Sequence, residues 1–176
     1  MEIQLSPQER MDAAFENYLA LTAILNEDLL ALGNSESDAQ HWRRNYIRVS
    51  ASLIEGYAHC LREMCSISFE CIAPDISQKE EKVIRSERIF DANDRIRLTL
   101  RAAYKLFELQ STPNFGGPEW PRAQRILEKR HLLMHPKSPS DLNIPDDIWE
   151  ELREDVTWLI ERFFNFMSAL EEKHGG

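Results

Sequence analysis

The sequence predicts an all-α protein, an antiparallel bundle of five to six helices that forms a single domain over residues 1–176. Two observations lead to this prediction. Strand signals are missing throughout, whereas helix caps and apolar residues at helical spacing recur along the chain. Two long striped segments lie at the ends of the chain, and short polar or Pro-rich connections separate the segments between them, which favours antiparallel neighbours.

The first helix is expected to begin at Ser6-Pro7-Gln8-Glu9. A serine cap, a proline in the first turn and a glutamate three residues after the serine together form a capping box. The helix should end near Gly33, since glycine commonly terminates helices. Its apolar stripe has spacings of four and three and consists of Met11, Phe15, Tyr18, Thr22, Leu25, Leu29 and Leu32.

A second long helix is expected over residues 38–71, after a polar connection at 34–38, with Pro74 as its far limit. Its apolar side carries Tyr46, Val49, Leu53, Tyr57, Cys60 and Met64. A short helix is expected after Ser77, and a further one over residues 93–110.

The second half of the chain has two segments that are rich in proline, at 111–120 and 136–147, and both are expected to be loops. A helix over residues 120–135 should lie between them. The last helix has apolar residues at spacings of three and four, namely Trp149, Leu152, Val156, Leu159, Phe163, Phe166 and Leu170. The aromatic residues of this helix are expected in the core or at a dimer seam.

Composition indicates a soluble cytoplasmic protein with no membrane partner. Apolar residues make up 43% of the chain, an ordinary share, yet no apolar run approaches the roughly 18 residues that cross a bilayer. The start of the sequence, MEIQLSPQER, lacks the basic and apolar regions of a signal peptide. Cys60, Cys65 and Cys71 form no C-x-x-C pair and are expected to be reduced thiols.

The charge is unevenly distributed along the chain. A net charge of −9 argues against a general nucleic-acid binder, because affinity for phosphate comes largely from Lys and Arg. Residues 95–137, however, contain nine basic and three acidic residues. This stretch predicts either a local basic patch or ordinary solvated helix faces.

The stretch KRHLLMHP, residues 129–136, is the main candidate for a functional site. On a helix with about 100° per residue, Arg130 falls among the apolar residues of its neighbourhood, Ile126, Leu127, Leu133 and Met134. A guanidinium there requires an acidic partner, an anionic ligand or an opening in the bundle, because desolvating an unpaired charge costs several kcal/mol. Glu55, within the apolar run SASLIEGYAHC, is the candidate partner; alternatively, both side chains extend separately to solvent.

His135 precedes Pro136, and a residue before proline is disfavoured in helical geometry. His135 is therefore expected where the helix ends, with its ring able to turn towards Arg130. Histidine can exchange protons near neutral pH, and arginine offers a permanent planar charge for a phosphate. Together these side chains suit phosphodiester chemistry.

The segment Arg130-His131-Leu132-Leu133-Met134-His135 resembles the R-x4-H motif of the HEPN superfamily, whose members are small helical bundles and include many metal-independent RNases of toxin–antitoxin and defence systems. The resemblance implies a homodimer that brings two motifs into one cleft and needs no metal or cofactor. Arg130 would hold the scissile phosphate and His135 would transfer protons. His131 would position the backbone or tune its neighbours. Glu55 is the supporting residue suggested by its place in the apolar run, independently of the resemblance.

The resemblance also implies a substrate and partners. The RNA 2′-hydroxyl would be the nucleophile and a cyclic phosphate the product. Nearby cations are the candidate substrate-binding residues, namely Arg125, Lys129 and Lys137. An antitoxin such as a nucleotidyltransferase is a possible partner. Some members carry a tyrosine two residues after the last histidine, where this chain has Lys137, so regulation through that tyrosine is not expected.

Two other interpretations remain open at this point. His131 and His135 lie four residues apart on the predicted helix, a spacing at which two imidazoles can share a metal ion, although no third ligand is evident. Alternatively, the chain is a non-catalytic helical bundle that dimerises or docks a partner, since some HEPN domains do not cleave RNA and a fold does not settle activity.

Overall fold

The computed structural model describes residues 5–34, 39–72, 75–85, 90–110, 114–115 and 117–174. Within them the chain forms six α-helices and no strand, which confirms the predicted all-α bundle. The elements are α1 (Pro7–Gly33), α2 (Gln40–Cys71), α3 (Gln78–Arg85), α4 (Ala92–Leu106), α5 (Glu119–Met134), the 3₁₀ helix η1 (Pro139–Leu142) and α6 (Asp146–His174).

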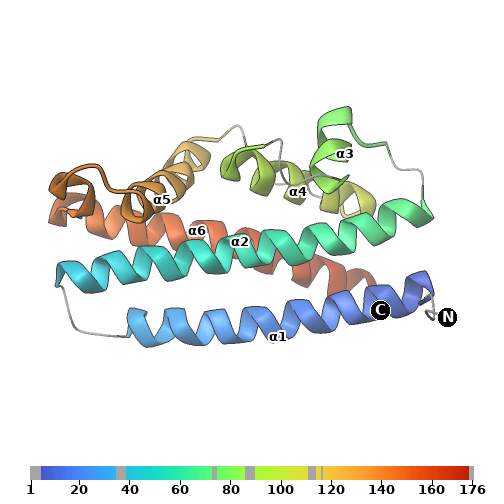
Figure 1. Cartoon of the computed structure of the whole chain (residues 1–176). Helices are drawn as coiled ribbons and strands as arrows, with labels where there is room; N and C mark the ends of the chain where they lie inside the picture. Colours follow the sequence, from blue (N-terminus) through green and yellow to red (C-terminus); the bar gives the residue numbers. More distant parts are fainter. Residues whose placement is uncertain are drawn as a thin grey trace.

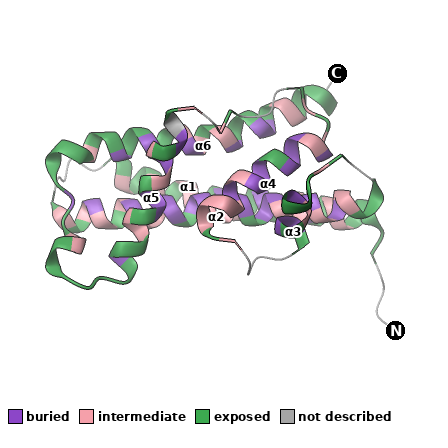
Figure 2. Cartoon of the chain, turned by 90° about the horizontal axis from the view of Figure 1, so that it is seen from above, coloured by how far each residue is buried: buried purple, intermediate pink, exposed green. Residues whose placement is uncertain are grey.

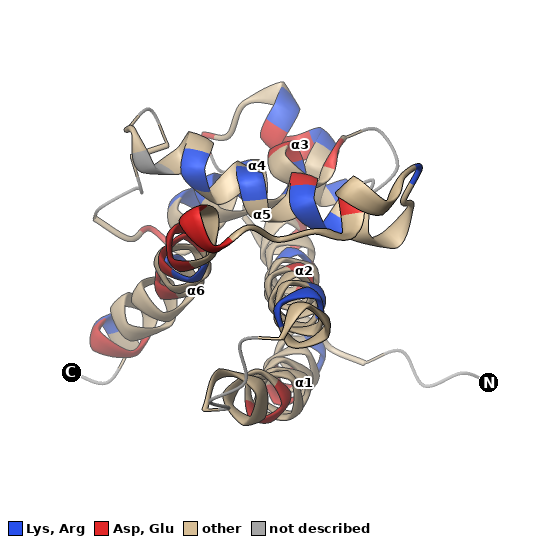
Figure 3. Ribbon diagram, turned by 90° about the vertical axis from the view of Figure 1, so that its left-hand side faces the viewer, with Lys and Arg blue, Asp and Glu red and all other residues tan. Residues whose placement is uncertain are grey.

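The long helix α2 lies at the centre of the bundle and packs against every other α-helix. α1 runs antiparallel to α2 along one side, and the shorter helices α3, α4 and α5 cover the opposite side (Figure 1). Seen end-on, α1, α2 and the α3–α5 layer follow one another, with α6 flanking α2 and α5 (Figure 3). α1 and α5 are therefore separated by α2.

One hydrophobic core takes side chains from all six α-helices, and the buried residues face inwards along α2 and α4 (Figure 2). Tyr57 of α2 shows how the helices are joined. Its ring stacks on Phe163 of α6 at a centroid distance of 5.1 Å and lies 5.6 Å from the ring of Tyr18 of α1. Its hydroxyl accepts a hydrogen bond of 2.7 Å from Nδ2 of Asn26, so this buried polar group is satisfied.

The predicted helix boundaries agree with the structure except near one end. The capping box is present at Ser6: its backbone N–H donates to Glu9 at 2.8 Å, and its hydroxyl accepts from the backbone of Glu9. α4 ends at Leu106, before the predicted limit of 110, because Glu108 adopts a left-handed backbone conformation with φ 50°. η1, in the second Pro-rich segment, was not predicted. The connection at 35–38, Pro74 and residues 111–113 lie outside the described residues.

Two buried carboxylates join neighbouring helices. Glu80 of α3 has no exposed surface, and its Oε2 accepts from Nζ of Lys105 on α4 at 2.8 Å and from the backbone of Ser77 at 2.6 Å. Asp155 of α6 is 2% exposed and lies 3.0 Å from the guanidinium nitrogens of both Arg122 and Arg125 of α5. A buried carboxylate is tolerated in a core only with such partners.

The surroundings shift the pKa values of these two carboxylates in opposite directions. Burial pushes the pKa of Glu80 up, but the hydrogen bonds from Lys105 and Ser77 outweigh it, so the pKa lies below its ordinary value. For Asp155, burial outweighs the attraction of Arg125 and Arg122 and raises the pKa. Ionised Glu80 therefore favours the folded state, whereas ionised Asp155 opposes it.

The three thiols are unbonded: Cys60 and Cys65 are buried and Cys71 is exposed. Burial raises the pKa of Cys65, which keeps the thiol protonated and unreactive. None of the helices within the described residues combines the length and apolar character that crossing a bilayer requires.

Candidate functional site

The candidate site lies at the C-terminal end of α5, where His135 leaves the helix. The backbone of His135 has φ −131° and ψ 56°, outside helical geometry, and its N–H donates to the carbonyl of His131 at 3.0 Å. Pro136 follows, and its ring disfavours helical geometry in the residue before it. The predicted end of the helix at His135 is confirmed.

Arg130 pairs with Glu55, the partner suggested by the sequence. Nη2 of Arg130 lies 3.3 Å from Oε2 of Glu55 on α2, and the two side chains remain 33% and 31% exposed. No second acceptor contacts this guanidinium among the described residues, although arginine has five N–H donors. Glu55 therefore fixes the position of the cation while leaving donors available to an anion.

A residue that the sequence reasoning missed also holds the end of α5. Nη2 of Arg48 on α2 donates to the carbonyl of Leu133 at 3.1 Å, which satisfies a carbonyl of the last turn. Arg48 and Glu55 are seven residues apart, about two helical turns, so they share the face of α2 that meets α5. This spacing was the available signal, because a basic and an acidic residue on one face of a central helix indicate polar contacts across it.

The surface of the helix end alternates apolar and titratable groups. His131 and His135 are exposed, and their ring centroids lie 5.2 Å apart with an interplanar angle of 53°. Leu133 is buried, but Leu132 and Met134 are 40% and 49% exposed. The helical wheel predicts Met134 on the apolar side, but this last residue of α5 is exposed.

The three predicted substrate-binding residues are held differently from Arg130. Nζ of Lys129 donates to the carbonyls of Asn143 at 2.7 Å and Asp141 at 3.2 Å, so this lysine anchors the loop that follows α5. Partial burial lowers its pKa, against the attraction of Asp141. Arg125 faces α6 and pairs with Glu151 as well as with buried Asp155.

Lys137, the third of these residues, is exposed and lies just beyond the end of α5. Its backbone N–H donates to Oδ2 of Asp141 at 2.8 Å, and no contact of its ammonium group is recorded within the described ranges. The structure thus brings together Arg130 with Glu55, and His131 with His135. Arg125 and Lys129 instead contact α6 and the loop after α5, respectively.

The basic stretch 95–137 is largely neutralised by carboxylates rather than gathered into one patch. On α4, Arg97 pairs with Asp94, and Arg101 and Lys105 approach Glu80. Figure 3 accordingly shows acidic residues beside basic ones on the helices above α2. Arg95 differs, since its guanidinium has no hydrogen-bond or ion-pair partner among the described residues.

The two motif histidines do not belong to a larger ligand cluster. No group of three His, Cys, Asp or Glu side chains suited to a metal ion occurs within the described ranges. The chemistry that the arrangement offers is a fixed, partly exposed guanidinium with two exposed imidazoles on the last turn of the same helix. This combination can bind an anion and exchange protons.

Comparisons of the chain with protein-family models, with curated proteins and with solved structures find no significant match.

Proposed function

We propose that the end of α5 binds and cleaves RNA phosphodiesters, and that the protein is a HEPN-like, metal-independent endoribonuclease of a toxin or defence system. One observation supports this most directly. Glu55 holds the guanidinium of Arg130 at the surface, at the end of a helix that exposes His131 and His135. In-line attack on a phosphodiester requires a cation and proton-transferring groups at one phosphate, and residues 130–135 carry both kinds of side chain.

In this proposal Arg130 binds the non-bridging oxygens of the scissile phosphate, and the guanidinium offsets the charge that grows on them in the transition state. A motif histidine takes the proton from the RNA 2′-hydroxyl as the 2′-oxygen bonds to phosphorus. The bond from phosphorus to the 5′-oxygen breaks, and a second imidazole protonates that oxygen. The products are a 2′,3′-cyclic phosphate and a 5′-hydroxyl.

The proposal includes a homodimer whose two motifs face one cleft. The residues that we expect to contribute to this contact are Leu132 and Met134, whose side chains are 40% and 49% exposed at the end of α5. Two copies meeting here would place four imidazoles and two guanidinium groups around one strand.

The test is cleavage of single-stranded RNA with EDTA present. Wild-type protein should cleave, while Arg130→Ala and His135→Ala should each lose at least about 100-fold in rate. His174→Ala, at the exposed end of α6, is the matched control and should retain activity. Cleavage that requires added metal would instead favour a metal site at His131 and His135.

A growth assay tests the cellular part of the proposal. Expression of the wild type should slow growth, and His135→Ala should not. Equal growth of the two strains would remove the support for a toxic RNase.

A non-catalytic docking module is the second candidate, and a different surface favours it. Two large apolar residues on one side of α1 are well exposed, Leu19 at 50% and Leu30 at 62%. Because α2 separates α1 from α5, this surface is remote from the motif (Figure 3). A strictly monomeric protein that is inert towards RNA would favour this candidate.

A further inference from the structure

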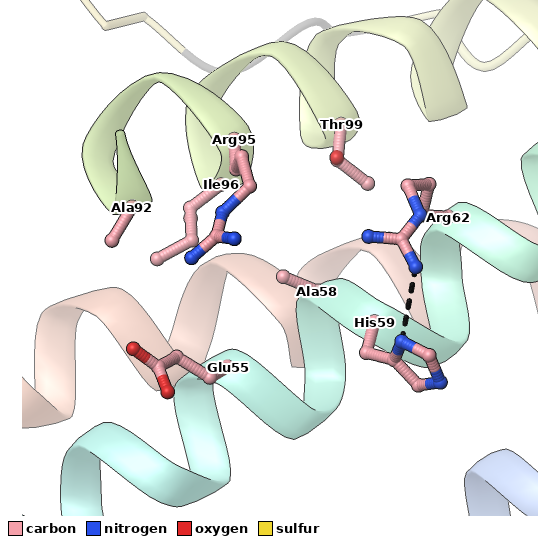
Figure 4. Close-up of a pocket in the computed structure, with 8 residues that line it drawn as sticks. All are labelled: Glu55, Ala58, His59, Arg62, Ala92, Arg95, Ile96 and Thr99. Atoms are coloured by element: carbon pink, nitrogen blue, oxygen red, sulfur yellow. Dashed lines mark hydrogen bonds between the residues drawn. The ribbon is translucent and has the colours of Figure 1, made fainter. Parts of the chain in front are cut away.

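A polar pocket lies between α2 and α4 and shares Glu55 with the candidate site. It has a volume of about 220 Å³, and its polar lining consists of Glu55, His59, Arg62, Arg95 and Thr99 (Figure 4). Ala58 and Ile96 form an apolar part of its wall. Glu55 belongs to both places, because its carboxylate also contacts Arg130.

Two guanidinium groups reach this pocket from opposite helices. Figure 4 shows the Arg95 side chain extending from α4 towards α2, and the Arg62 side chain extending from α2 beneath Thr99. No carboxylate or carbonyl within the described residues contacts the guanidinium of Arg95. A partly buried cation without a counter-charge is poorly stabilised unless an anion or water occupies the space in front of it.

Arg62 is held in place by a neighbour on its own helix. Its Nη2 lies 3.0 Å from Nδ1 of His59, and since a guanidinium only donates, Nδ1 accepts. Nε2 of the same ring lies 3.9 Å from Glu63. This arrangement orients the guanidinium and so reduces the entropy lost when it binds a ligand.

The lining favours a phosphate group over a carboxylate or a cation. Two planar guanidinium groups match the several oxygens of a phosphate, and the hydroxyl of Thr99 adds a polar group on the α4 side. The only carboxylate among the lining residues, Glu55, is already paired with Arg130. The pocket is also smaller than the roughly 300–1,000 Å³ of drug-sized ligand sites, which suits a small group.

We propose that the pocket between α2 and α4 binds a phosphate group, and that this phosphate is a neighbour, on the same RNA strand, of the one bound at Arg130. The assignment of this phosphate to an RNA strand rests on the function proposed above. Arg95 and Arg62 bind this second phosphate, and Glu55 lies between the two phosphate positions. The pocket then determines where the strand lies relative to the motif.

The experiment measures binding without cleavage, using a short single-stranded oligonucleotide with 2′-deoxy sugars. Affinity is measured over a range of salt concentrations for the wild type, Arg95→Ala and Arg153→Ala. Arg153 is the matched control, an arginine of α6 whose recorded ion pair is a 3.4 Å contact with exposed Glu150. Circular dichroism confirms that all three proteins are folded.

Loss of one phosphate contact should lower the slope of log affinity against log salt by about 0.7. Arg95→Ala should show this change with an affinity loss of about tenfold, as expected for one charged hydrogen bond. Arg95→Lys should lie between Arg95→Ala and the wild type, because it keeps the charge but not the planar fork. Arg153→Ala should match the wild type.

Inorganic phosphate and a nucleoside monophosphate serve as further probes. If Arg95→Ala loses these ligands but binds the strand normally, the pocket holds a free phosphate compound and the assignment to a strand is overturned. If Arg95→Ala equals the wild type with every probe, the phosphate site itself is overturned. Failure of the proposed function appears separately, as undiminished cleavage by Arg130→Ala, since the binding assay needs no cleavage.

Discussion

The guanidinium of Arg130 and the carboxylate of Glu55 form an ion pair between α5 and α2, with 3.3 Å between Nη2 and Oε2 and 75 positions between them in sequence. About a third of each side chain stays exposed. Exposed ion pairs contribute only about 0–1 kcal/mol to stability. The pair therefore matters more for where the guanidinium lies than for the folding of the chain.

Glu55→Gln should lower the rate of RNA cleavage about 10- to 100-fold and change KM little, because a displaced guanidinium loses transition-state contacts more than ground-state ones. Single-turnover kinetics separates the two effects. Glu27→Gln, on the exposed side of α1, is the control and should retain full activity. A rate in Glu55→Gln equal to the wild type would show that Glu55 does not position Arg130.

Leu132→Lys and Met134→Lys should weaken the proposed dimer at least about 100-fold, because each places an unpaired ammonium group in the contact surface. Both side chains are exposed in the protomer, so the fold should persist. Light scattering after size-exclusion chromatography measures the effect. Leu30→Lys, on the remote surface of α1, should stay dimeric; the opposite pattern would place the interface on α1.

Lys105→Met should destabilise the protein by about 3 kcal/mol, the upper end of the cost of removing a charged hydrogen-bond partner from a buried group, with Arg101 at 3.5 Å as the cation that remains near Glu80. Glu80 has no exposed surface, and Lys105 is its closest cation at 2.8 Å. For a chain of this size the melting temperature should fall by roughly 6–12 °C. The double variant Glu80→Gln/Lys105→Met should recover part of this loss, because no buried charge remains, and calorimetry compares the two.

Acidification should reveal the contribution of Glu80. Its folded-state pKa lies below the ordinary value of 4.5, so the stability it provides is complete above about pH 4.5 and is lost as pH falls through the folded-state value. Urea unfolding at several pH values should show a shallower decline in Glu80→Gln than in the wild type. Equal slopes would mean that Glu80 titrates alike in the folded and unfolded chains.

Asp155 should show the opposite behaviour. Burial raises its folded-state pKa above the ordinary 3.8, so ionisation makes the fold less stable as pH rises through that region. Asp155→Asn keeps the shape and removes the charge, and at pH 7 it should equal or exceed the wild type in stability. A loss of more than about 2 kcal/mol would indicate that the contacts with Arg122 and Arg125 outweigh the cost of burial.

The sequence predicted those features that depend on local pattern. The striped helices, the cap at Ser6 and the end of α5 at His135 follow from spacing and from proline chemistry, and all are confirmed. Glu55 could be paired with Arg130 because Glu55 is a charge within an apolar run and Arg130 falls among apolar residues on the helical wheel, and the structure shows the pair. Such anomalies can be recognised without coordinates.

Features that depend on packing were not predicted. Glu80 lies in a short helix of polar composition, and its burial results from the way α3 packs on α4. The hydrogen bond from Arg48 to Leu133 requires the relative position of two helices, which periodicity does not provide. Similarly, the pairing of Arg122 and Arg125 with Asp155 divides a basic stretch that appeared continuous in the sequence.

The end of α5 is anchored from two directions: Arg48 binds the carbonyl of Leu133 on one side, and Lys129 binds the carbonyls of Asp141 and Asn143 on the other. The backbone that carries the histidines is thus preorganised, and its conformational entropy is lost when the chain folds rather than when a ligand arrives. Recognition at this turn then requires only rotation of the exposed rings about their own bonds.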